Sequence, residues 1–260
     1  MKSPLTLDLH GRLAVVTGST SELGRTMVRT LAGCGADIAV HYFSNRERAD
    51  HLVEEVHAMG CRAHAFQADV GDATSVMNLK DQISSTLGEP EIVITNAVSQ
   101  YPWRPVLEQN LADYHDQYRT SIAQNVLIAQ AFVPGMVARR RGRFIGISTE
   151  CVMQCAPTQS AYVSGKHGMH AVLRCLAKEI GPSGVTVNEV APGWTISDKY
   201  RAGGQFVGED DRGYVSKVPM ARRGTDQEIA HAVAFLASDL ASFITGVYLP
   251  VCGGNVMPCV

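Results

Sequence analysis

The sequence is poor in charged residues. Asp, Glu, Lys and Arg make up 18% of its 260 residues, and the formal net charge at pH 7 is −2. Proteins that bind nucleic-acid backbones usually carry a marked basic excess, so the composition argues against a nucleic-acid partner. The local basic run at 139–143 is typical of a solvated helix C-terminus, where cations oppose the helix dipole.

Long hydrophobic runs and regularly spaced cysteines are also lacking. No apolar run approaches the ~18–20 residues of a membrane span, and the opening residues, MKSPLTLDLHGR, are too polar for a signal peptide. The seven cysteines are scattered. Only Cys151 and Cys155 lie close together, without a histidine or a second pair to complete a zinc site. We therefore expect a cytoplasmic protein with reduced thiols, no membrane partner and no metal site.

The sequence does contain apolar, β-type runs that alternate with helix-length segments. The predicted strands are 13–17, 37–42, 62–70, 91–96, 143–149, 185–190 and 247–251. The predicted helices are 22–33, 45–59, 73–87, 111–139, 160–180 and 226–238. Near-continuous apolar strands separated by helices predict an α/β fold with a doubly wound, Rossmann-like parallel sheet of about seven strands and helices on both faces.

The same pattern favours a single dinucleotide-binding domain over 1–260. The only loop-like insertion is the glycine-rich segment 198–217, which we expect to form a lid over the substrate. In sheets of this type, ligands bind outside the carboxyl ends of the strands. The residues that follow the strands are therefore the first candidates for a site.

The stretch TGSTSELG at 17–24 follows the first strand and begins the first helix. A turn of this kind holds a phosphate on backbone N–H groups, and its glycines allow a close approach. Glu22 stands in the middle of the turn. Its carboxylate would either repel a pyrophosphate, by ~4 kcal/mol at ~4 Å, or point to solvent and favour the helix dipole.

The stretch YVSGK at 162–166 carries the candidate chemistry. Tyr162 and Lys166 are four residues apart, so they lie on one face of the predicted helix. A nearby ammonium lowers the pKa of a phenol, which then exchanges protons near neutral pH. Thr149, at the end of a predicted strand, supplies a hydroxyl that can donate to the same substrate oxygen.

Seven motifs occur in the order and spacing of a known family. They are TGSTSELG at 17–24, ADV at 68–70, TNA at 95–97, GRFIGIST at 142–149, YVSGK at 162–166, VNEVAPGW at 187–194, and the segment 222–254. In these motifs nearly the whole chain resembles the short-chain dehydrogenase/reductase family. The resemblance implies a nicotinamide cofactor and interconversion of a carbonyl and a secondary alcohol.

The resemblance also implies roles for individual residues. Tyr162 is the acid/base, Thr149 takes the place of the usual serine, and Lys166 lowers the tyrosine pKa and holds the nicotinamide ribose. Ser121 falls where the family has a helical asparagine. The implied cofactor-binding residues are Gly18, Ser19, Thr20, Ser21, Leu23, Gly24, Ser44, Asn45, Arg46, Asp69, Val70, Asn96, Ala97, Tyr162, Lys166, Pro192, Gly193, Thr195 and Ile196.

The end of the second strand favours NADP(H), with NAD(H) as the alternative. NAD-selective sheets commonly carry an acidic residue there, whereas this chain has Ser44, Asn45 and Arg46, which suit a 2′-phosphate. The substrate side is predicted to contain Cys151, Met153, Gln154, Trp194 and Tyr200. Further candidates are Tyr101, Trp103, Phe206 and Tyr214. Aromatic and thioether groups suit a small apolar or ring-bearing carbonyl or alcohol.

Two hypotheses remain open at this point. The first is an NAD(P)(H)-dependent carbonyl or ketoacyl reductase, assembled as a homotetramer or a homodimer through the helices at 111–139 and 160–180. The second is a divergent member of the family with weak or lost redox turnover, acting as an isomerase, a lyase, a dehydratase or a binding module. The second is motivated by Glu22, by Ser121 and by Val98, which stands where the family has glycine.

Overall fold

The central element of the fold is a parallel β-sheet. The structure, a computed structural model, describes residues 6–196 and 209–258. Seven strands are hydrogen-bonded in the order β3-β2-β1-β4-β5-β6-β9, and all neighbours are parallel. Their bounds are β1 (Leu13–Val16), β2 (Asp37–Tyr42), β3 (Ala63–Gln67), β4 (Ile92–Thr95), β5 (Gly142–Ile147), β6 (Val185–Pro192) and β9 (Tyr248–Val251). The predicted doubly wound sheet is confirmed.

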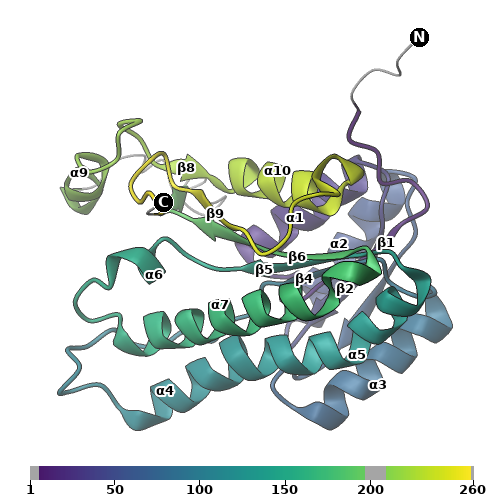
Figure 1. Cartoon of the computed structure of the whole chain (residues 1–260), viewed down its shortest axis with the longest axis horizontal. Coiled ribbons are helices and arrows are strands. Elements are labelled where there is room, and N and C mark those ends of the chain that lie inside the picture. The colour runs from purple at the N-terminus through teal and green to yellow at the C-terminus, as the bar shows by residue number, and fades with distance from the viewer. Residues whose placement is uncertain (1–5, 197–208, 259–260) are drawn as a thin grey trace.

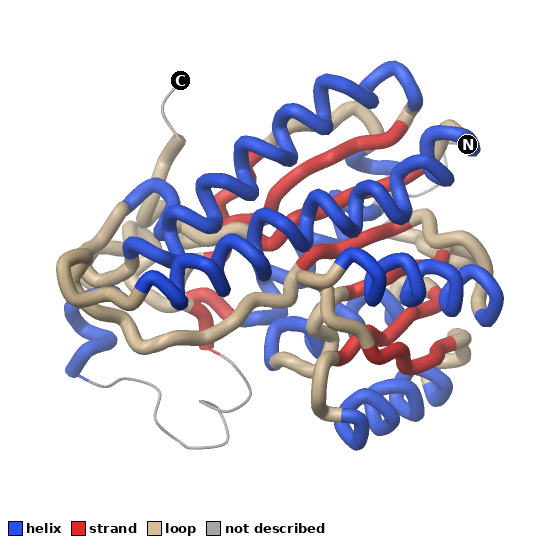
Figure 2. Tube along the Cα trace, turned by 90° about the horizontal axis from the view of Figure 1, so that it is seen from below, coloured by secondary structure: helices blue, strands red, loops and turns tan. Residues whose placement is uncertain are grey.

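Helices cover both faces of the sheet (Figure 1). One layer contains α1 (Glu22–Gly33), α2 (Arg46–Ala58) and α10 (Asp226–Ala237). The other contains α3 (Ala73–Thr86), α5 (Gln124–Arg139) and α7 (Ser160–Ile180); the long helices run roughly along the direction of the strands in Figure 2. Each layer forms its own apolar cluster with one face of the sheet. Burial on both faces explains why the strands are almost entirely apolar.

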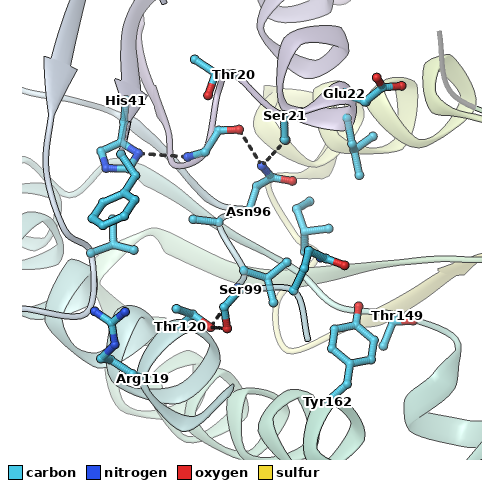
Figure 3. Close-up of a pocket in the computed structure, with 18 of the residues that line it drawn as sticks. Thr20, Ser21, Glu22, His41, Asn96, Ser99, Arg119, Thr120, Thr149 and Tyr162 are labelled. Carbon is cyan, nitrogen blue, oxygen red and sulfur yellow. Dashed lines mark hydrogen bonds between the residues drawn. The ribbon is translucent and has the colours of Figure 1, made fainter. Parts of the chain in front are cut away.

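Side-chain caps fix where two helices begin at the carboxyl edge of the sheet. Ser21 is the N-cap of α1, and its hydroxyl accepts a hydrogen bond from Gly24 N at 3.1 Å. Asn45 is the N-cap of α2, and its Oδ1 accepts from Arg48 N at 2.9 Å. Caps of this type stabilise a helix by ~1 kcal/mol. Here they also hold two helix starts beside the pocket drawn in Figure 3.

The segment 111–139, which we predict as one helix, is divided into three parts. They are α4 (Leu111–Gln117), a π-helix η1 (Tyr118–Ala123) and α5. A π-turn widens the helix locally, and a hydrophobic pattern does not record it. By length and composition the run Leu111–Arg139 would also pass as a membrane-crossing helix, but half of its most apolar window is buried within the fold. It packs on β4, β5 and α7 as a core helix does.

The predicted lid, 198–217, lies partly outside the described residues, as do Tyr200 and Phe206. Its described part contains a helix, α9 (Glu209–Val215), rather than a loop. A two-stranded sheet of β7 (Thr195–Ile196) and β8 (Gly224–Thr225) flanks it. The short helices α6 (Cys151–Gln154), η2 (Gly181–Ser183) and η3 (Asp239–Ala241) complete the described elements.

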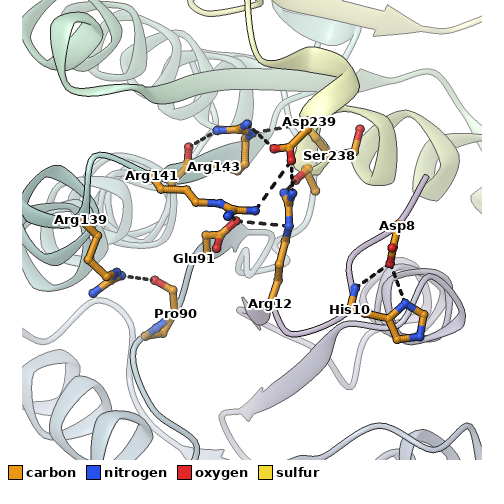
Figure 4. A network of polar contacts seen from close by, with 12 residues as sticks. Asp8, His10, Arg12, Pro90, Glu91, Arg139, Arg141, Arg143, Ser238 and Asp239 are labelled. Carbon is orange, nitrogen blue, oxygen red and sulfur yellow. Dashed lines mark hydrogen bonds and ion pairs between the residues drawn. The ribbon is translucent and has the colours of Figure 1, made fainter. Parts of the chain in front are cut away.

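A network of charged side chains lies at the amino edge of the sheet (Figure 4). Arg12 and Arg143, both buried, reach Asp239 at 2.5 and 3.0 Å. Arg12 and Arg141 also contact Glu91, at 3.3 and 2.9 Å. The basic run 139–143 is therefore not only a solvated helix end, because its last arginine enters β5 and is buried among carboxylate and carbonyl partners.

Candidate active site

A cavity of about 790 Å³ opens at the carboxyl edge of the sheet (Figure 3). It lies between β1 and β4, where the order of the strands in the sheet reverses. Doubly wound sheets bind their ligands at this position. Its volume lies within the range of cofactor pockets. The predicted residues that line it are Gly18, Thr20, Ser21, Leu23, Ser44, Asn45, Asp69, Val70, Asn96, Ala97, Thr149, Tyr162, Lys166, Pro192 and Gly193.

The turn after β1 is built around two glycines. Gly18 has a φ of +63°, and a Cβ there would lie 3.0 Å from the Ala97 Cα. A Cβ on Gly24 would lie 2.3 Å from the Gly18 carbonyl oxygen. Asn96 fastens the turn from the neighbouring strand, donating to the carbonyl oxygens of Thr17 and Gly18 at 2.9 and 3.2 Å. Gly24 therefore has a packing role and does not line the cavity.

His41, on β2, contacts this turn, and the sequence pattern did not identify it as a site residue. Its Nδ1 accepts a hydrogen bond from Gly18 N at 2.9 Å, and its Nε2 donates to Ala68 O at 3.1 Å. Burial lowers the pKa of His41 to about 4, so the ring is neutral at pH 7. Within the described part of the chain, no acceptor lies on the N–H groups of Thr20 and Leu23. These two N–H groups at the start of α1 suit an anion.

Glu22 does not direct its carboxylate across the turn. It occupies the first position of α1, its side chain is 35% exposed, and its Oε1 lies 3.8 Å from Arg25 Nη2. Figure 3 shows the carboxylate at the rim, directed away from Ser21 and Asn96. This arrangement corresponds to the solvent-facing alternative, in which the acidic group favours the helix dipole.

The prediction for Arg46 is corrected by the structure. Arg46 Nε donates to both oxygens of Asp50 at 2.8 Å on the exposed side of α2, away from the cavity. Arg48 lines the cavity instead, together with Ser44 and Asn45. The rotation of the helix after its N-cap decides which arginine faces inward, and the sequence pattern does not reveal that rotation.

Asp69 is paired within the protein. Its two oxygens accept from Arg119 Nη1 at 2.8 and 2.7 Å, and its Oδ1 also accepts from Gly71 N at 2.9 Å. Arg119 belongs to η1, so the π-helix brings this cation to the cavity. Arg119 lies on the side of the cavity opposite Tyr162 (Figure 3), and Asp69 lines the same cavity.

Tyr162 and Thr149 meet at the inner end of the cavity, and Lys166 lies beneath them. Both residues line the cavity, and Lys166 Nζ lies 5.9 Å from the centre of the Tyr162 ring. Lys166 Nζ donates to Ile147 O at 2.7 Å. Burial lowers the pKa of Lys166 to about 8. Burial raises the pKa of Tyr162, and the nearby Thr149 hydroxyl opposes the shift, so the lowering of this pKa by Lys166 stays a prediction.

Ser121 does not reach the cavity. It is fully buried in η1, and its Oγ has no hydrogen-bond partner. Asn125, in the following helix α5, contacts Ser121: its Nδ2 donates to Ser121 O at 2.7 Å, and its Oδ1 accepts from Thr95 at 2.6 Å. The asparagine position is thus filled by a serine whose hydroxyl points into the core.

A second cavity of about 510 Å³ adjoins the first. Its predicted lining residues are Tyr101, Trp103, Cys151, Gln154, Trp194 and Tyr214. Trp103 stacks on Tyr162, with ring centres 6.5 Å apart, and Tyr101 accepts a hydrogen bond from Tyr162 N at 2.7 Å. Met153, by contrast, is exposed and lies outside this lining. Tyr162 and Thr149 line both cavities.

Glu150 is a site residue that sequence reasoning missed. It lines the second cavity and is 3% exposed. Asn255 Nδ2 donates to its Oε2 at 3.0 Å, and Tyr214 lines the same cavity. Burial raises the pKa of Glu150. A lone carboxylate next to Thr149 in the chain carries no spacing signal, so only the structure shows that it lines the second cavity and contacts the C-terminal segment.

Three predicted cofactor residues take structural positions instead. Ser19 is buried and donates to Val16 O at 2.6 Å. Thr195 and Ile196 pair with β8, and Thr195 O accepts from Arg223. None of the three is among the residues lining the larger cavity. Thr195 and Ile196 are outside it because they pair with β8, and Ser19 because its side chain is buried against β1.

Sequence comparison relates most of the chain to known enzymes. Residues 18–255 match the family model described as enoyl-(acyl carrier protein) reductase. The 3-oxoacyl-[acyl-carrier-protein] reductase of Staphylococcus aureus is 33% identical over 254 residues, covering 94% of this chain and 98% of that protein. The enzyme of the same name from Escherichia coli is 32% identical, covering 96% of this chain and 100% of that protein.

Solved structures agree with this relationship. A gluconate 5-dehydrogenase from Burkholderia cenocepacia, in complex with NADP and tartrate, superposes with a TM-score of 0.88 at 28% identity and 96% coverage of both chains. A 7α-hydroxysteroid dehydrogenase, in complex with NADH and 7-oxo glycochenodeoxycholic acid, gives 0.89 at 27% identity and 98% coverage of both. The chain belongs to the short-chain dehydrogenase/reductase family of oxidoreductases.

Proposed function

We propose that this protein interconverts a carbonyl and a secondary alcohol on a small, apolar or ring-bearing substrate, using NADP(H). The observation that carries the proposal is that the Tyr162 and Thr149 hydroxyls stand where the two cavities meet. A substrate oxygen placed there is within reach of both hydroxyls, while its carbon faces the larger cavity. The 3-oxoacyl reductases among the relatives support this class of reaction.

The larger cavity fits a dinucleotide. The N–H groups of Thr20 and Leu23 would hold the pyrophosphate, Val70 the adenine, and Asn96 the adenosine ribose. Tyr162 and Lys166 would hold the nicotinamide ribose. The bound cofactor would supply or accept the hydride. The carbonyl oxygens fixed by Asn96 and the glycine contacts at 18 and 24 support a cradle that is already formed.

The residues of the chain supply the proton and position the oxygen. Tyr162 donates its phenolic proton to the substrate oxygen in the reducing direction and accepts it in the reverse direction. Thr149 holds that oxygen through its hydroxyl. Lys166, protonated below about pH 8, stabilises the phenolate that remains. Trp103 and Trp194 cover the second cavity and limit the access of water to it.

The preference for NADP(H) is proposed to depend on Arg48. Its guanidinium makes no hydrogen bond or ion pair with any described residue, and it lines the cavity beside Ser44 and Asn45. A charge-assisted contact to a 2′-phosphate contributes about 1.5–3 kcal/mol. The relatives of known structure are described with NADP in one case and NADH in another. The proposed preference of this chain therefore depends on its own residues beside the cavity.

Titration of nicotinamide fluorescence tests both parts of the proposal. NADPH should bind at least tenfold more tightly than NADH, and Arg48→Ala should remove most of that difference. Arg46→Ala is the matched control, because Arg46 pairs with Asp50, and it should change neither affinity by more than twofold. Equal affinities in the wild type would remove the NADP(H) preference. No binding of either nucleotide at millimolar concentration would contradict the reductase and favour a non-redox member of the family.

We also propose a homotetramer, or a homodimer, whose subunits pair through α5 and α7. An apolar groove of about 610 Å³ between these helices supports it. Its lining includes Val126, Val133, Pro134, Val172 and Leu176. Val172→Asp should lower the mass measured by light scattering, whereas Leu107→Asp, at a fully exposed site away from the groove, should not.

A further inference from the structure

Glu189 is a buried carboxylate that the proposed mechanism does not yet use. It lies on β6, where its register partners are Gly146 on β5 and Tyr248 on β9. A Cβ on Gly146 would meet Leu173 of α7 at 2.4 Å, so this face of the sheet is turned toward α7. Register partners point to the same face. Glu189 and Tyr248 therefore face α7, and the missing side chain of Gly146 leaves room beside them.

Only one oxygen of Glu189 is paired. Its Oε1 lies 2.8 Å from His170 Nδ1 on α7. Among the residues that the structure describes, no hydrogen-bond partner lies on its buried Oε2, and the side chain is 2% exposed. A half-satisfied buried carboxylate is costly and calls for an explanation. His170 is 23% exposed, so this imidazole connects the buried carboxylate to the surface of α7.

Lys166 lies on the same face of α7, one turn before His170. Its ammonium has three N–H donors, and among the described residues only Ile147 O accepts from it. The charge of Glu189 raises the pKa of Lys166 against the larger opposing effect of burial. Glu189 contacts His170 on the face of α7 that also carries Lys166, and among the described residues it forms no ion pair with the ammonium.

The other elements packed around Glu189 bring few titratable groups. β9 contributes Tyr248, whose hydroxyl donates to Thr149 O at 2.7 Å and whose ring meets the His170 ring edge-on at 5.7 Å. β5 contributes Gly146, which has none. The polar groups that link Lys166 to the surface on this side are therefore Glu189 and His170.

We propose that Glu189 and His170 carry protons between the surface of α7 and Lys166, and so restore the Tyr162–Lys166 pair after each turnover. The proposal rests on the proposed function. In the reducing direction, Tyr162 gives its proton to the substrate oxygen, and Lys166 returns one to the phenolate through an intervening hydroxyl or water. The Glu189–His170 pair then returns a proton to Lys166, and His170 takes one from solvent at Nε2. No redox partner beyond that of the proposed reaction is needed.

The first test measures Lys166 itself and requires no cofactor. The protein is labelled with ¹³C at the lysine ε-carbons, and the Lys166 signal, identified by its loss in Lys166→Arg, is titrated by NMR. Glu189→Gln keeps the shape but removes the charge, so the Lys166 pKa should fall by at least ~0.5 unit. Thr186→Val, which removes another buried unpartnered group from β6, is the control and should leave it unchanged. An unchanged Lys166 pKa in Glu189→Gln would overturn the proposal.

The second test measures proton delivery during turnover. In His170→Ala, kcat for reduction of a carbonyl substrate should fall at least fivefold with KM within twofold, and added imidazole should restore it. The solvent deuterium isotope effect on kcat should rise. His167→Ala, the control, changes an exposed histidine on the same helix. It should change neither kcat nor the solvent isotope effect. Loss of kcat without rescue would assign His170 a structural role. A wild type without turnover would contradict the proposed function, while the Lys166 titration would still test the role of Glu189.

Discussion

The amino and carboxyl edges of the sheet both carry buried polar side chains, but they differ in how these side chains are paired. At the amino edge, the buried Arg12 and Arg143 both reach Asp239, and Glu91 completes the charge pairing (Figure 4). At the carboxyl edge, Ser148 Oγ and Gln159 Oε1 belong to residues that line the two cavities, and both are buried without a partner among the described residues. The charged groups of the amino edge are paired with one another, whereas the carboxyl edge keeps hydrogen-bonding capacity for a ligand.

This difference follows from the direction of the strands. In a parallel sheet all carboxyl ends lie on one side, where the loops are free to form a site, and the amino ends lie on the other. Substitutions at the amino edge should therefore change stability and leave binding intact. Substitutions at the carboxyl edge should change turnover or binding with little effect on stability.

The largest expected effect is at the carboxyl edge. Tyr162→Phe should lower turnover by about 10²–10⁴-fold, the usual contribution of a general acid. The nucleotide dissociation constant should stay within twofold, and the free energy of unfolding should change little. Steady-state kinetics together with denaturant unfolding measure all three quantities. Activity within threefold of the wild type would show that the proton comes from another group.

His41 is the expected exception at the carboxyl edge, because it is buried and fully hydrogen-bonded. Its pKa is lowered from 6.5 to about 4 by burial, so the unfolded chain binds a proton first as the pH falls. The free energy of unfolding should then decrease between pH 6.5 and 4, by about 3 kcal/mol in total. His41→Gln should show a shallower decrease over that range. Identical slopes in the two proteins would assign the acid sensitivity to other groups.

At the amino edge, Asp239→Asn should destabilise the protein without changing its chemistry. Asp239 is 63% exposed, but two of its three arginine partners, Arg12 and Arg143, are buried. The expected loss lies between that of a surface pair and that of a buried one, at about 2 kcal/mol. Asp81→Asn, at an exposed pair with Lys80, is the control and should cost less than about 0.5 kcal/mol. A change in nucleotide affinity in Asp239→Asn would contradict the separation of the two edges.

The smallest effect is expected at Glu22. Because its carboxylate lies at the rim beside Arg25, Glu22→Gly should change nucleotide affinity by less than twofold. Stability should fall by up to ~1 kcal/mol, the cost of glycine in a helix. A tenfold gain in affinity that shrinks as salt is raised would instead show that the carboxylate repels the pyrophosphate.

The fold could be predicted because its signals are local and repeated. Apolar strands such as 37–42 and helices such as 160–180 appear in the structure with the same bounds. The pairing of Tyr162 with Lys166 follows from helical periodicity alone. The turn at 17–24 could be placed because only glycine fits where two segments of backbone come close together.

The remaining features depend on orientations that a linear pattern does not contain. Whether Arg46 or Arg48 faces the cavity is decided by the rotation of α2 after its cap. The π-helix η1 cannot be told from the α-helical pattern on either side of it in the sequence. In the structure it places Arg119 in the cavity and Ser121 in the core. Glu189 stands in an apolar strand, and its contact with α7 becomes visible only once the register of β5, β6 and β9 is known.

The wall shared by the two cavities has a kinetic consequence. Ser99, Gln100, Thr149, Tyr162 and Gly193 line both of them. A nucleotide in the larger cavity would form the floor of the smaller one, so a substrate would meet its complete binding surface only after the nucleotide has entered. Such a layout imposes a compulsory order, with the nucleotide first to arrive and last to leave. A second substrate molecule could bind before the product nucleotide has dissociated and would then block its release. High substrate concentrations would therefore lower the turnover rate.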